Sequence, residues 1–338
     1  MTKTKVAING FGRIGRLVFR ALLESDRTDI EVVGINDLAP ADMNAHLLTW
    51  DSVHGKLPFD ITLDGDLMKV KDQNVKMCSE RNPEDLPWGD LDVDIVFECT
   101  GIFLKKEMAS KHIQAGAKKV IVSAPSPDAD LTVVYGINHD KITADMDVIS
   151  NASCTTNCLA PVAYVLDKEF GISHGFMTTI HAFTGDQRTV DTAHKDPYRA
   201  RAASVSMIPT STGAAKAVGL VLPHLNGKLD GVAIRVPTAD VSLVDLKCVL
   251  NKEVTAEQIN AAIKKYAEGE LKGVLGYNEL PLVSVDYTTN PNSSTFDAPG
   301  TKVMQDGFVR VMTWYDNEWG FSNRMLDTAA AFAKTFKS

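Results

Sequence analysis

The sequence predicts an α/β protein with two domains, a doubly wound parallel sheet followed by an α+β domain with a large mixed or antiparallel sheet. Three observations indicate this fold class. A glycine-rich turn separates a strand from a helix near the N-terminus, strands and helices alternate in the first half of the chain, and most later segments are strands. We therefore expect domains at residues 1–152 and 153–321.

Charge and composition exclude several classes of function. The chain has 338 residues, of which 44% are hydrophobic and 23% charged, as is ordinary for a globular protein. Its net charge of -8 and its lack of a Lys/Arg cluster predict no nucleic-acid partner. The first apolar run, Val6–Ile8, is too short for a signal-peptide core or a membrane span. We expect a cytoplasmic protein without a membrane partner.

The cysteines predict neither disulfides nor a metal site. They are odd in number and irregularly spaced, which fits neither a disulfide framework nor a Cys-x-x-Cys cluster. We expect free thiols in a reducing compartment and no bound metal. The five positions are Cys78, Cys99, Cys154, Cys158 and Cys248.

The first elements are a strand at Thr4–Asn9 and a helical pattern from Leu17, with three glycines between them. Their Gly-x-Gly-x-x-Gly spacing permits a tight turn, close approach of the backbone to a pyrophosphate, and close packing of helix on strand. The stretch predicts a Rossmann-type dinucleotide site. The residues expected at the cofactor are Gly10, Gly12, Arg13, Ile14 and Gly15.

The next strand, Glu31–Asp37, ends in an acid 22 positions after Gly15. An acid about 20 residues beyond such glycines binds the ribose hydroxyls of the adenosine and repels a 2′-phosphate. Asp37 therefore favours NAD over NADP.

The rest of the first domain continues the alternation, with one insertion. Ile61–Leu63 and Leu67–Val70 flank Asp64-Gly65, which indicates an antiparallel hairpin. The further expected elements are strands at 93–98, 119–123, 133–135 and 148–149 and a helix at about 105–115.

Cys154 stands where a strand end turns into a helix, since Val148-Ile149 precedes it and a helical apolar pattern begins at Leu159. Unpaired N–H groups and the helix dipole favour an anion at a helix start, so this position predicts a lowered thiol pKa. A buried cysteine can equally serve as a small hydrophobe. The hydroxyl and amide side chains around Cys154 favour reactivity, but local chemistry leaves both interpretations open.

The second half of the chain is rich in strands. A capping pair, Thr255 and Gln258, predicts the start of a helix at 256–267. A last helix from Ser322 has one apolar face. The other expected elements are strands at 174–183, 231–236, 242–250, 283–287 and 308–315 and a helix at 212–217.

A nucleophilic thiol needs a base, and anionic ligands need arginines, hydroxyls and free N–H groups. His181 lies where an apolar strand gives way to small polar residues, and a histidine at a strand end more often caps or packs than catalyses. Arg235 ends another strand, and Ser211–Lys216 offers hydroxyls at a helix start. Taken singly, each arginine could be a surface charge.

The stretch Ala152-Ser153-Cys154-Thr155-Thr156-Asn157-Cys158-Leu159-Ala160-Pro161 resembles the active-site signature of phosphorylating glyceraldehyde-3-phosphate dehydrogenases. Met177–Gln187 resembles the second signature of that family. Further matches run from Asn9 to Gly320. The resemblance implies an NAD-dependent homotetramer in which the C-terminal helix, 322–336, completes the NAD-binding domain.

The resemblance also implies roles for individual residues. Cys154 would be the nucleophile and His181 the base, whereas His54 matches a segment without a chemical role. Arg199 would serve both phosphate sites, with Arg201 as the alternative. Arg81, Ser123 and Asn317 would contact NAD; Thr184 and Arg235 would hold the substrate phosphate; and Ser153, Thr155, Thr212 and Gly213 would hold the attacking phosphate. Ala193 departs from the proline or serine usual in the family, which leaves tolerance of NADP open.

The expected reaction is the oxidation and phosphorylation of D-glyceraldehyde 3-phosphate to 1,3-bisphosphoglycerate, through a thiohemiacetal and a thioester on Cys154. Two alternatives are an erythrose-4-phosphate dehydrogenase and a non-catalytic NAD-binding redox sensor using Cys154 and Cys158. Asp37 and the predicted phosphate ligands argue against the first. Arg235 argues against the second, because a sensor needs no substrate-phosphate arginine. The sequence leaves the direction of flux, regulation and other partners undetermined.

Overall fold

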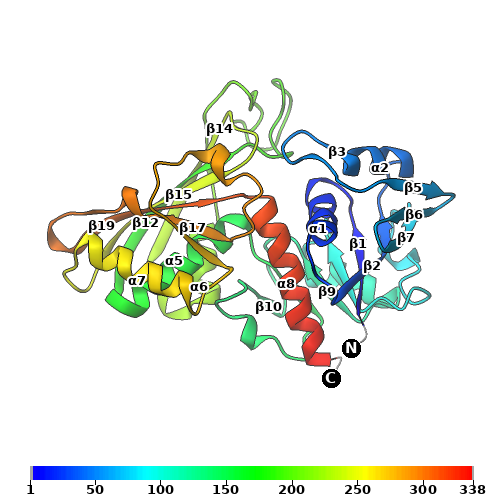
Figure 1. The fold of residues 1–338 in the computed structure, drawn as a ribbon, viewed down its shortest axis with the longest axis horizontal. Helices are drawn as coiled ribbons and strands as arrows, with labels where there is room; N and C mark the ends of the chain where they lie inside the picture. The colour runs from blue at the N-terminus through cyan, green and yellow to red at the C-terminus, as the bar shows by residue number, and fades with distance from the viewer. Residues whose placement is uncertain (1–2, 337–338) are drawn as a thin grey trace. The chain divides into compact units, whose positions relative to one another are not determined.

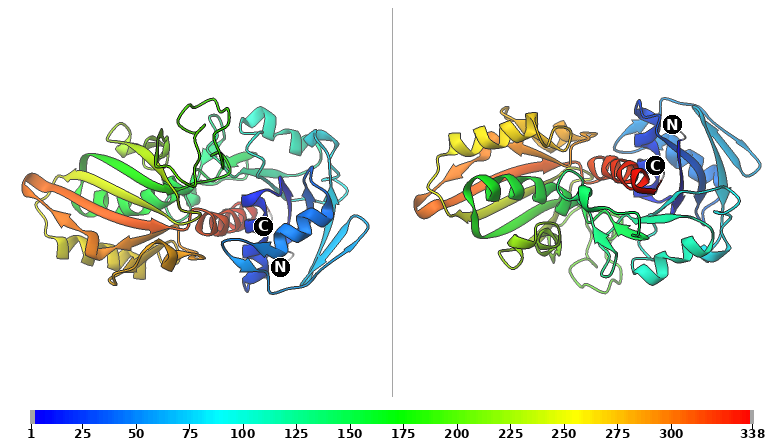
Figure 2. Two further views of the ribbon diagram at one scale, coloured as in Figure 1. Left: turned by 90° about the horizontal axis from the view of Figure 1, so that it is seen from above. Right: turned by 90° about the horizontal axis from the view of Figure 1, so that it is seen from below.

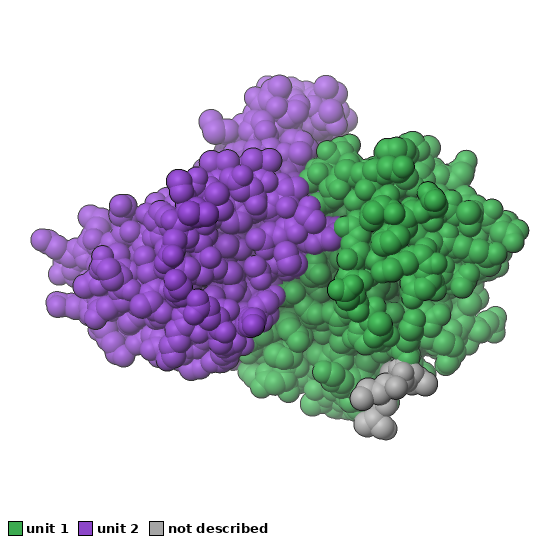
Figure 3. Space-filling model, in the orientation of Figure 1, with its two compact units in different colours: residues 1–152, 322–338 green, residues 153–321 purple. Residues whose placement is uncertain are grey.

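Two units make up the structure, a computed structural model in which residues 3–336 are described (Figures 1 and 3). Unit 1 runs to Ala152 and also includes the chain from Ser322 onward. Unit 2 is Ser153–Phe321. No helix among residues 3–336 has the length and apolar character needed to cross a membrane.

Unit 1 contains a nine-stranded sheet that is parallel except at one edge, which confirms the predicted doubly wound fold. Strand β1 lies between β2 and β8, so the connections leave it in opposite directions. Ligands of such sheets bind beyond the carboxyl ends of the strands at this reversal. The strand order is β10 (Leu131–Thr132), β11 (Val148–Ser150), β9 (Lys119–Val122), β8 (Ile95–Glu98), β1 (Thr4–Asn9), β2 (Ile30–Asn36), β7 (Gln73–Cys78), β6 (Leu67–Val70) and β5 (Ile61–Asp64).

The last helix of the chain, α8 (Trp319–Phe336), is tied to other parts of unit 1 by polar contacts. Thr328 Oγ1 donates to Asn151 Oδ1 at 2.8 Å, and Arg27 pairs with Asp327 at 2.5 Å. These contacts join the C-terminal segment to residues that lie far from it in the sequence. The other helices of unit 1 are α1 (Arg13–Glu24), α2 (Ala41–Thr49), α3 (Lys106–Ala109) and α4 (Lys111–Gln114), and a small ribbon pairs β3 (Trp50–Asp51) with β4 (Gly55–Lys56).

Unit 2 is built on a large mixed sheet, as predicted, with helices along one face (Figure 1). Seen from below in Figure 2, helix α5 (Cys154–Phe170) lies in front of this sheet. The strand order is β13 (Ile208–Ser211), β14 (Leu229–Val236), β12 (Ile172–Ala182), β15 (Ser242–Leu250), β19 (Phe308–Tyr315), β17 (Ser294–Asp297) and β16 (Leu275–Asn278), and β18 (Lys302–Val303) pairs with β19. The other helices are α6 (Ala214–Val221) and α7 (Ala256–Glu268).

Several predicted elements differ from those in the structure. The alternating stretch 283–287 forms a 3₁₀ turn at Ser284–Tyr287 rather than a strand, because Asp286 accepts a hydrogen bond from the Val283 N–H. The predicted strand at 133–135 does not form, because β10 ends at Thr132 and a turn begins at Tyr135, where the Val134 N–H donates to the Asn138 side chain. The predicted helix at 105–115 is two short helices, α3 and α4, and α6 begins two residues later than predicted. The capping pair at the start of α7 is confirmed.

Candidate active site

Helix α5 begins at Cys154, as predicted. Ser153 is its N-cap, and its hydroxyl accepts a hydrogen bond from the Thr156 N–H at 3.1 Å. Just before it, Ala152 has a left-handed φ of 57°, which turns the chain sharply out of β11. This turn and cap place the thiol at the first residue of the helix.

The Cys154 sulfur lies 3.5 Å from Nε2 of His181. His181 is buried near the end of β12, and its Nδ1 lies 2.7 Å from the Ala182 carbonyl oxygen. An Nδ1–H that donates to this carbonyl leaves the Nε2 lone pair facing the thiol. The structure therefore brings the predicted nucleophile and base together, and the tautomer with a proton on Nδ1 is the one that general base catalysis needs.

The pKa of the Cys154 thiol is raised, so the expectation of a lowered value is wrong. Burial is the largest cause, and it outweighs the nearby Arg235 charge and the hydrogen bonds from Thr155. Burial, followed by the charges of Arg235 and Arg199, lowers the pKa of His181 to about 3. Both shifts favour a neutral thiol facing a neutral imidazole over an ion pair.

Arg235 stands beside His181 because β12 and β14 are paired in register at these two residues. Its Nη1 lies 3.0 Å from the Ala182 oxygen and 2.8 Å from Nδ1 of His181. Its Nε–H is buried without a hydrogen-bond partner among the described residues. A buried, unpaired guanidinium N–H is costly unless an anion binds it, so Arg235 fits an anion site.

Of the two alternative arginines, the structure brings Arg199 into this region. Arg199 pairs with Asp186 at 2.6 Å, and its charge acts on the pKa values of both His181 and Arg235. Arg201 pairs instead with Asp191, and its side chain is 67% exposed.

The predicted phosphate ligands lie near the two ends of β13. Arg235 is paired with Ile208, the first residue of β13. Thr212 and Gly213 follow the last residue of β13, and the Thr212 hydroxyl accepts from the Ala214 N–H at the start of α6. The Arg199 side chain donates to the Ser211 carbonyl at 3.4 Å, next to Thr212, and its charge also acts on Arg235. Thr184 contacts Gln187 through both its N–H and its hydroxyl.

Asn317 is held by a residue that the sequence did not reveal. Ser242 donates to Asn317 Oδ1 at 2.7 Å and accepts from the Ala182 N–H at 3.0 Å. Ser242 therefore fixes Asn317 relative to the residue that follows His181. A serine in an alternating strand gives no signal of such a role.

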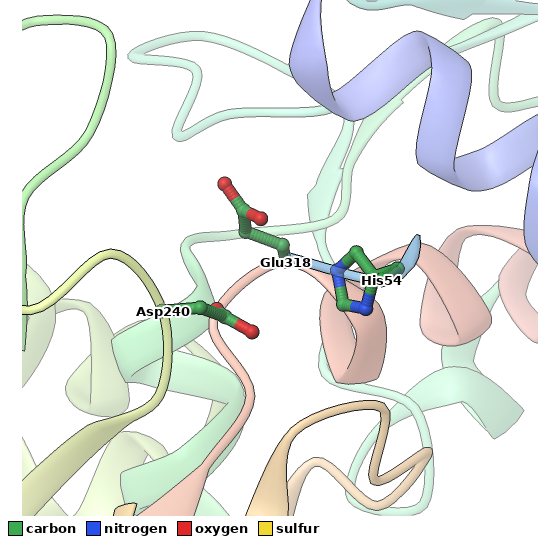
Figure 4. Close-up of side chains that lie close together, drawn as sticks. All are labelled: His54, Asp240 and Glu318. Carbon is green, nitrogen blue, oxygen red and sulfur yellow. The ribbon is translucent and has the colours of Figure 1, made fainter. Parts of the chain in front are cut away.

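A cluster of three carboxyl groups joins Asp240 with the two sequence neighbours of Asn317, Asp316 and Glu318. Asp240 is only 7% exposed, and burial together with the carboxylates of Asp316 and Glu318 raises its pKa to about 9. Asp240 therefore carries a proton at neutral pH. Figure 4 shows Asp240 and Glu318; the third labelled side chain, His54, belongs to unit 1.

In unit 1, the ends of β1, β2 and β8 border a cavity of about 510 Å³. Asp37 holds the glycine-rich turn at its edge, since its carboxylate accepts from the Phe11 N–H at 2.7 Å. Among the predicted cofactor residues, Gly10, Gly12, Asp37 and Arg81 line the cavity. Ser123, Arg13 and Ile14 do not, and the Arg13 guanidinium pairs with Asp51. Ser123 follows β9 and hydrogen-bonds to Cys99.

A different structural requirement accounts for glycine at each of the three positions of the turn. Gly10 has a φ of 91°, and a Cβ there would lie 2.7 Å from the Thr100 nitrogen. A Cβ on Gly15 would collide with the Gly10 carbonyl, which enforces close packing of α1 on β1. Gly12 has open space beside it, as a backbone approached by a ligand requires.

A doubly wound unit with a glycine-rich turn and an acid after its second strand is typical of NAD-dependent oxidoreductases. The family model described as glyceraldehyde 3-phosphate dehydrogenase, NAD binding domain, matches residues 4–106. The model for the C-terminal domain of the same enzyme matches residues 153–317. The chain belongs to the glyceraldehyde-3-phosphate dehydrogenase family.

Similar proteins cover almost the whole chain. A glyceraldehyde-3-phosphate dehydrogenase of Xanthobacter flavus is 62% identical over 330 residues, which is 98% of each chain. One from Cereibacter sphaeroides is 60% identical with the same coverage, and glyceraldehyde-3-phosphate dehydrogenase 1 of Bacillus subtilis is 59% identical over 98% of each chain. Neither alternative function finds support among these relatives.

Proposed function

We propose that the protein converts D-glyceraldehyde 3-phosphate and inorganic phosphate to 1,3-bisphosphoglycerate, with Cys154 as nucleophile and His181 as base. The observation that carries this assignment is the 3.5 Å separation between the Cys154 sulfur and Nε2 of His181, whose other nitrogen faces a carbonyl. Bound NAD supplies the hydride acceptor.

The proton moves between the two side chains as the bonds change. As the Cys154 sulfur bonds to the aldehyde carbon, Nε2 of His181 relays the thiol proton to the new hydroxyl group. When the carbon loses its hydride, Nε2 takes the hydroxyl proton and a thioester remains. A phosphate oxygen then bonds to the carbonyl carbon, the C–S bond breaks, and the leaving sulfur recovers the proton. The Arg235 charge destabilises the intervening imidazolium, which favours return of the proton.

The cofactor is assigned to the cavity of unit 1 and to Asn317. Gly10, Gly12 and Gly15 would bring the backbone to the pyrophosphate, and Asp37 would bind the ribose hydroxyls. Arg13, Ile14, Arg81 and Ser123 complete the proposed NAD ligands. Unit 1, with the helix segment 322–336, is then the NAD-binding domain, and unit 2 is the catalytic domain.

Two anion sites are assigned in unit 2. Arg235 and Thr184 would hold the substrate phosphate, which would give the buried Nε–H of Arg235 a partner. The attacking phosphate would bind near Thr212 and Gly213, with Ser153 and Thr155 at the start of α5. Arg199 would serve both sites, because it contacts Ser211, next to Thr212, and its charge also acts on Arg235.

The protein is proposed to be a cytoplasmic homotetramer. All five cysteines are free, as in a reducing compartment. The segment near Arg199 exposes large apolar side chains, including Val205 at 77% and Met207 at 74%. Apolar side chains gathered on one exposed segment mark an interaction surface. Light scattering after gel filtration tests this assembly, and a monomer at micromolar concentration would contradict it.

A single assay tests the function: NADH formation from the triose phosphate in the presence and absence of inorganic phosphate. We expect turnover that depends on phosphate and is faster than with erythrose 4-phosphate. A preference for erythrose 4-phosphate, or NADH formation indifferent to phosphate, would overturn the assignment.

A further inference from the structure

The hydroxyl of Tyr315 links the helix that carries the thiol to the strand that carries the imidazole. It lies 2.8 Å from the hydroxyl of Thr155, the residue after Cys154 at the start of α5. It also lies 2.8 Å from the hydroxyl of Thr179, two residues before His181 on β12. All three side chains are buried, so water does not compete for these bonds.

The sheet register explains how Tyr315 reaches both elements. Ile180 of β12 is paired with Leu243 of β15, and Ser242 of β15 is paired with Tyr315 of β19. Tyr315 therefore lies at the level of His181, two strands away. Its ring meets the imidazole edge-on, with centroids 5.8 Å apart and planes at 86°. This contact and the two hydrogen bonds fix the ring, the thiol helix and the imidazole strand to one another.

The number of protons allows this chain of hydroxyl groups more than one direction, of which one leaves a proton free on Thr155. Three hydroxyls carry three protons, and two of these are used in the contacts between them. If Thr179 donates to Tyr315 and Tyr315 to Thr155, the Thr155 proton remains available. A hydrogen bond from the Thr155 side chain to Cys154 is one of the influences that favour the thiolate. Each bond in such a chain strengthens the next.

We propose that Tyr315 is a positioning residue for the thiol and imidazole pair, and that its hydroxyl orients Thr155 so that the remaining hydroxyl proton points at the Cys154 sulfur. This inference rests on the proposed roles of Cys154 and His181. The same Thr155 proton is the one that its hydroxyl could offer to an attacking phosphate. Tyr315 therefore favours the thiolate before the thioester forms, and Thr155 can turn to phosphate afterwards.

Alkylation of Cys154 tests the proposal without any substrate. In Tyr315→Phe the ring stays and only the oxygen is lost. We expect the pH midpoint of iodoacetamide alkylation at Cys154 to rise by about half to one unit, because Thr155 is less well oriented and its hydrogen bond to the thiolate is weakened without being removed. The rate at pH 7 should fall about three- to tenfold, and the affinity for NAD should not change.

Two further variants make the result decisive. Tyr287→Phe is the matched control, since Tyr287 is also a buried tyrosine of unit 2 and its hydroxyl makes no hydrogen bond within the described residues. Its alkylation midpoint should equal that of the wild type. Thr179→Val keeps Tyr315 and removes the hydroxyl that hydrogen-bonds to it from β12. It should raise the alkylation midpoint by a smaller amount, and it replaces Tyr315→Phe as the test if that variant does not fold.

A lower melting temperature for Tyr315→Phe with an unchanged alkylation midpoint would overturn the proposal and leave Tyr315 a structural residue. An equal shift in Tyr287→Phe would overturn it as well. A wild-type protein that alkylates normally but forms no NADH from the triose phosphate would contradict the proposed function instead. The two failures are therefore distinguishable.

Discussion

Two sets of buried ionisable groups, one in each unit, have opposite surroundings. In unit 1, Glu98 and His112 are fully buried, and each has partners at both polar ends. Glu98 accepts from Thr100, Asn9 and His112, and His112 also accepts from the Trp88 N–H. In unit 2, His181 and Asp240 are buried beside charges of the sign that disfavours their ionised forms.

The buried groups of unit 1 support the wall of a cavity, whereas those of unit 2 have the properties of groups that take part in a reaction. Asn9, which the unit 1 network holds, borders the cavity, and Asn36 joins it there through a 2.7 Å hydrogen bond. A fully paired network fixes the walls of a binding cavity. The groups of unit 2 have displaced pKa values, as groups that exchange protons during a reaction commonly do. The predictions below test this contrast, from the largest expected effect to the smallest.

Cys154→Ser should abolish turnover, because a hydroxyl is a far weaker nucleophile near neutral pH and forms no thioester. The matched control is Cys158→Ser, one helical turn further along α5. Cys158 is buried against Ser294, and it should be dispensable for activity. The assay is phosphate-dependent NADH formation. Turnover by Cys154→Ser above background would refute the role of the thiol.

His181→Asn should lower the rate by about 10² to 10⁴, the usual contribution of a general base. It should also change stability in acid. Because the pKa of His181 falls from 6.5 to about 3 on folding, the unfolded chain binds the extra proton and stability is lost as the pH falls through this window. The variant should lose less stability than the wild type between pH 6.5 and 4 in urea unfolding. The exposed His174→Asn is the control, and an equal acid profile for all three proteins would contradict the assignment.

Asp240→Asn should stabilise the protein at alkaline pH. The folded chain keeps the Asp240 proton from pH 3.8 to about 9, whereas the unfolded chain loses it, so stability falls as the pH rises through this window. At pH 8 the gain should be on the order of 2 to 4 kcal/mol, measured by chemical unfolding. The exposed Asp60→Asn is the control. A gain that does not change with pH would show that Asp240 is ionised in the fold.

Asp37→Ala should have the smallest effect, a shift in cofactor preference toward NADP by about tenfold, since it removes one carboxylate facing the 2′-phosphate. It also removes the acceptor of the Phe11 N–H, so some loss of NAD affinity is expected. The measurement is the ratio of kcat/KM for the two cofactors. An unchanged ratio would mean that Asp37 only holds the glycine-rich turn in place through the Phe11 N–H, as Glu98 holds Thr100 and Asn9.

Local patterns predicted much of this structure, and long-range contacts account for what they missed. The spacing of Gly10, Gly12 and Gly15 and the capping pair of α7 act within a few residues, so the sequence reveals them. Ser242 and Tyr315 gain their roles from strands that meet only in the folded sheet. The Cys154 pKa was predicted from the helix start alone, whereas burial, which depends on the whole unit, decides its direction.

The pairing of β12 with β14 also bears on how the active site assembles during folding. His181 and Arg235 are 54 residues apart in the sequence and meet only when two parallel strands align. Such non-local parallel pairing is slow, because a long loop must close before the contacts form. Helix α5 is a local element, whereas the thiol and the imidazole can face each other only once these distant segments have come together. The geometry of the site therefore depends on the non-local step of folding.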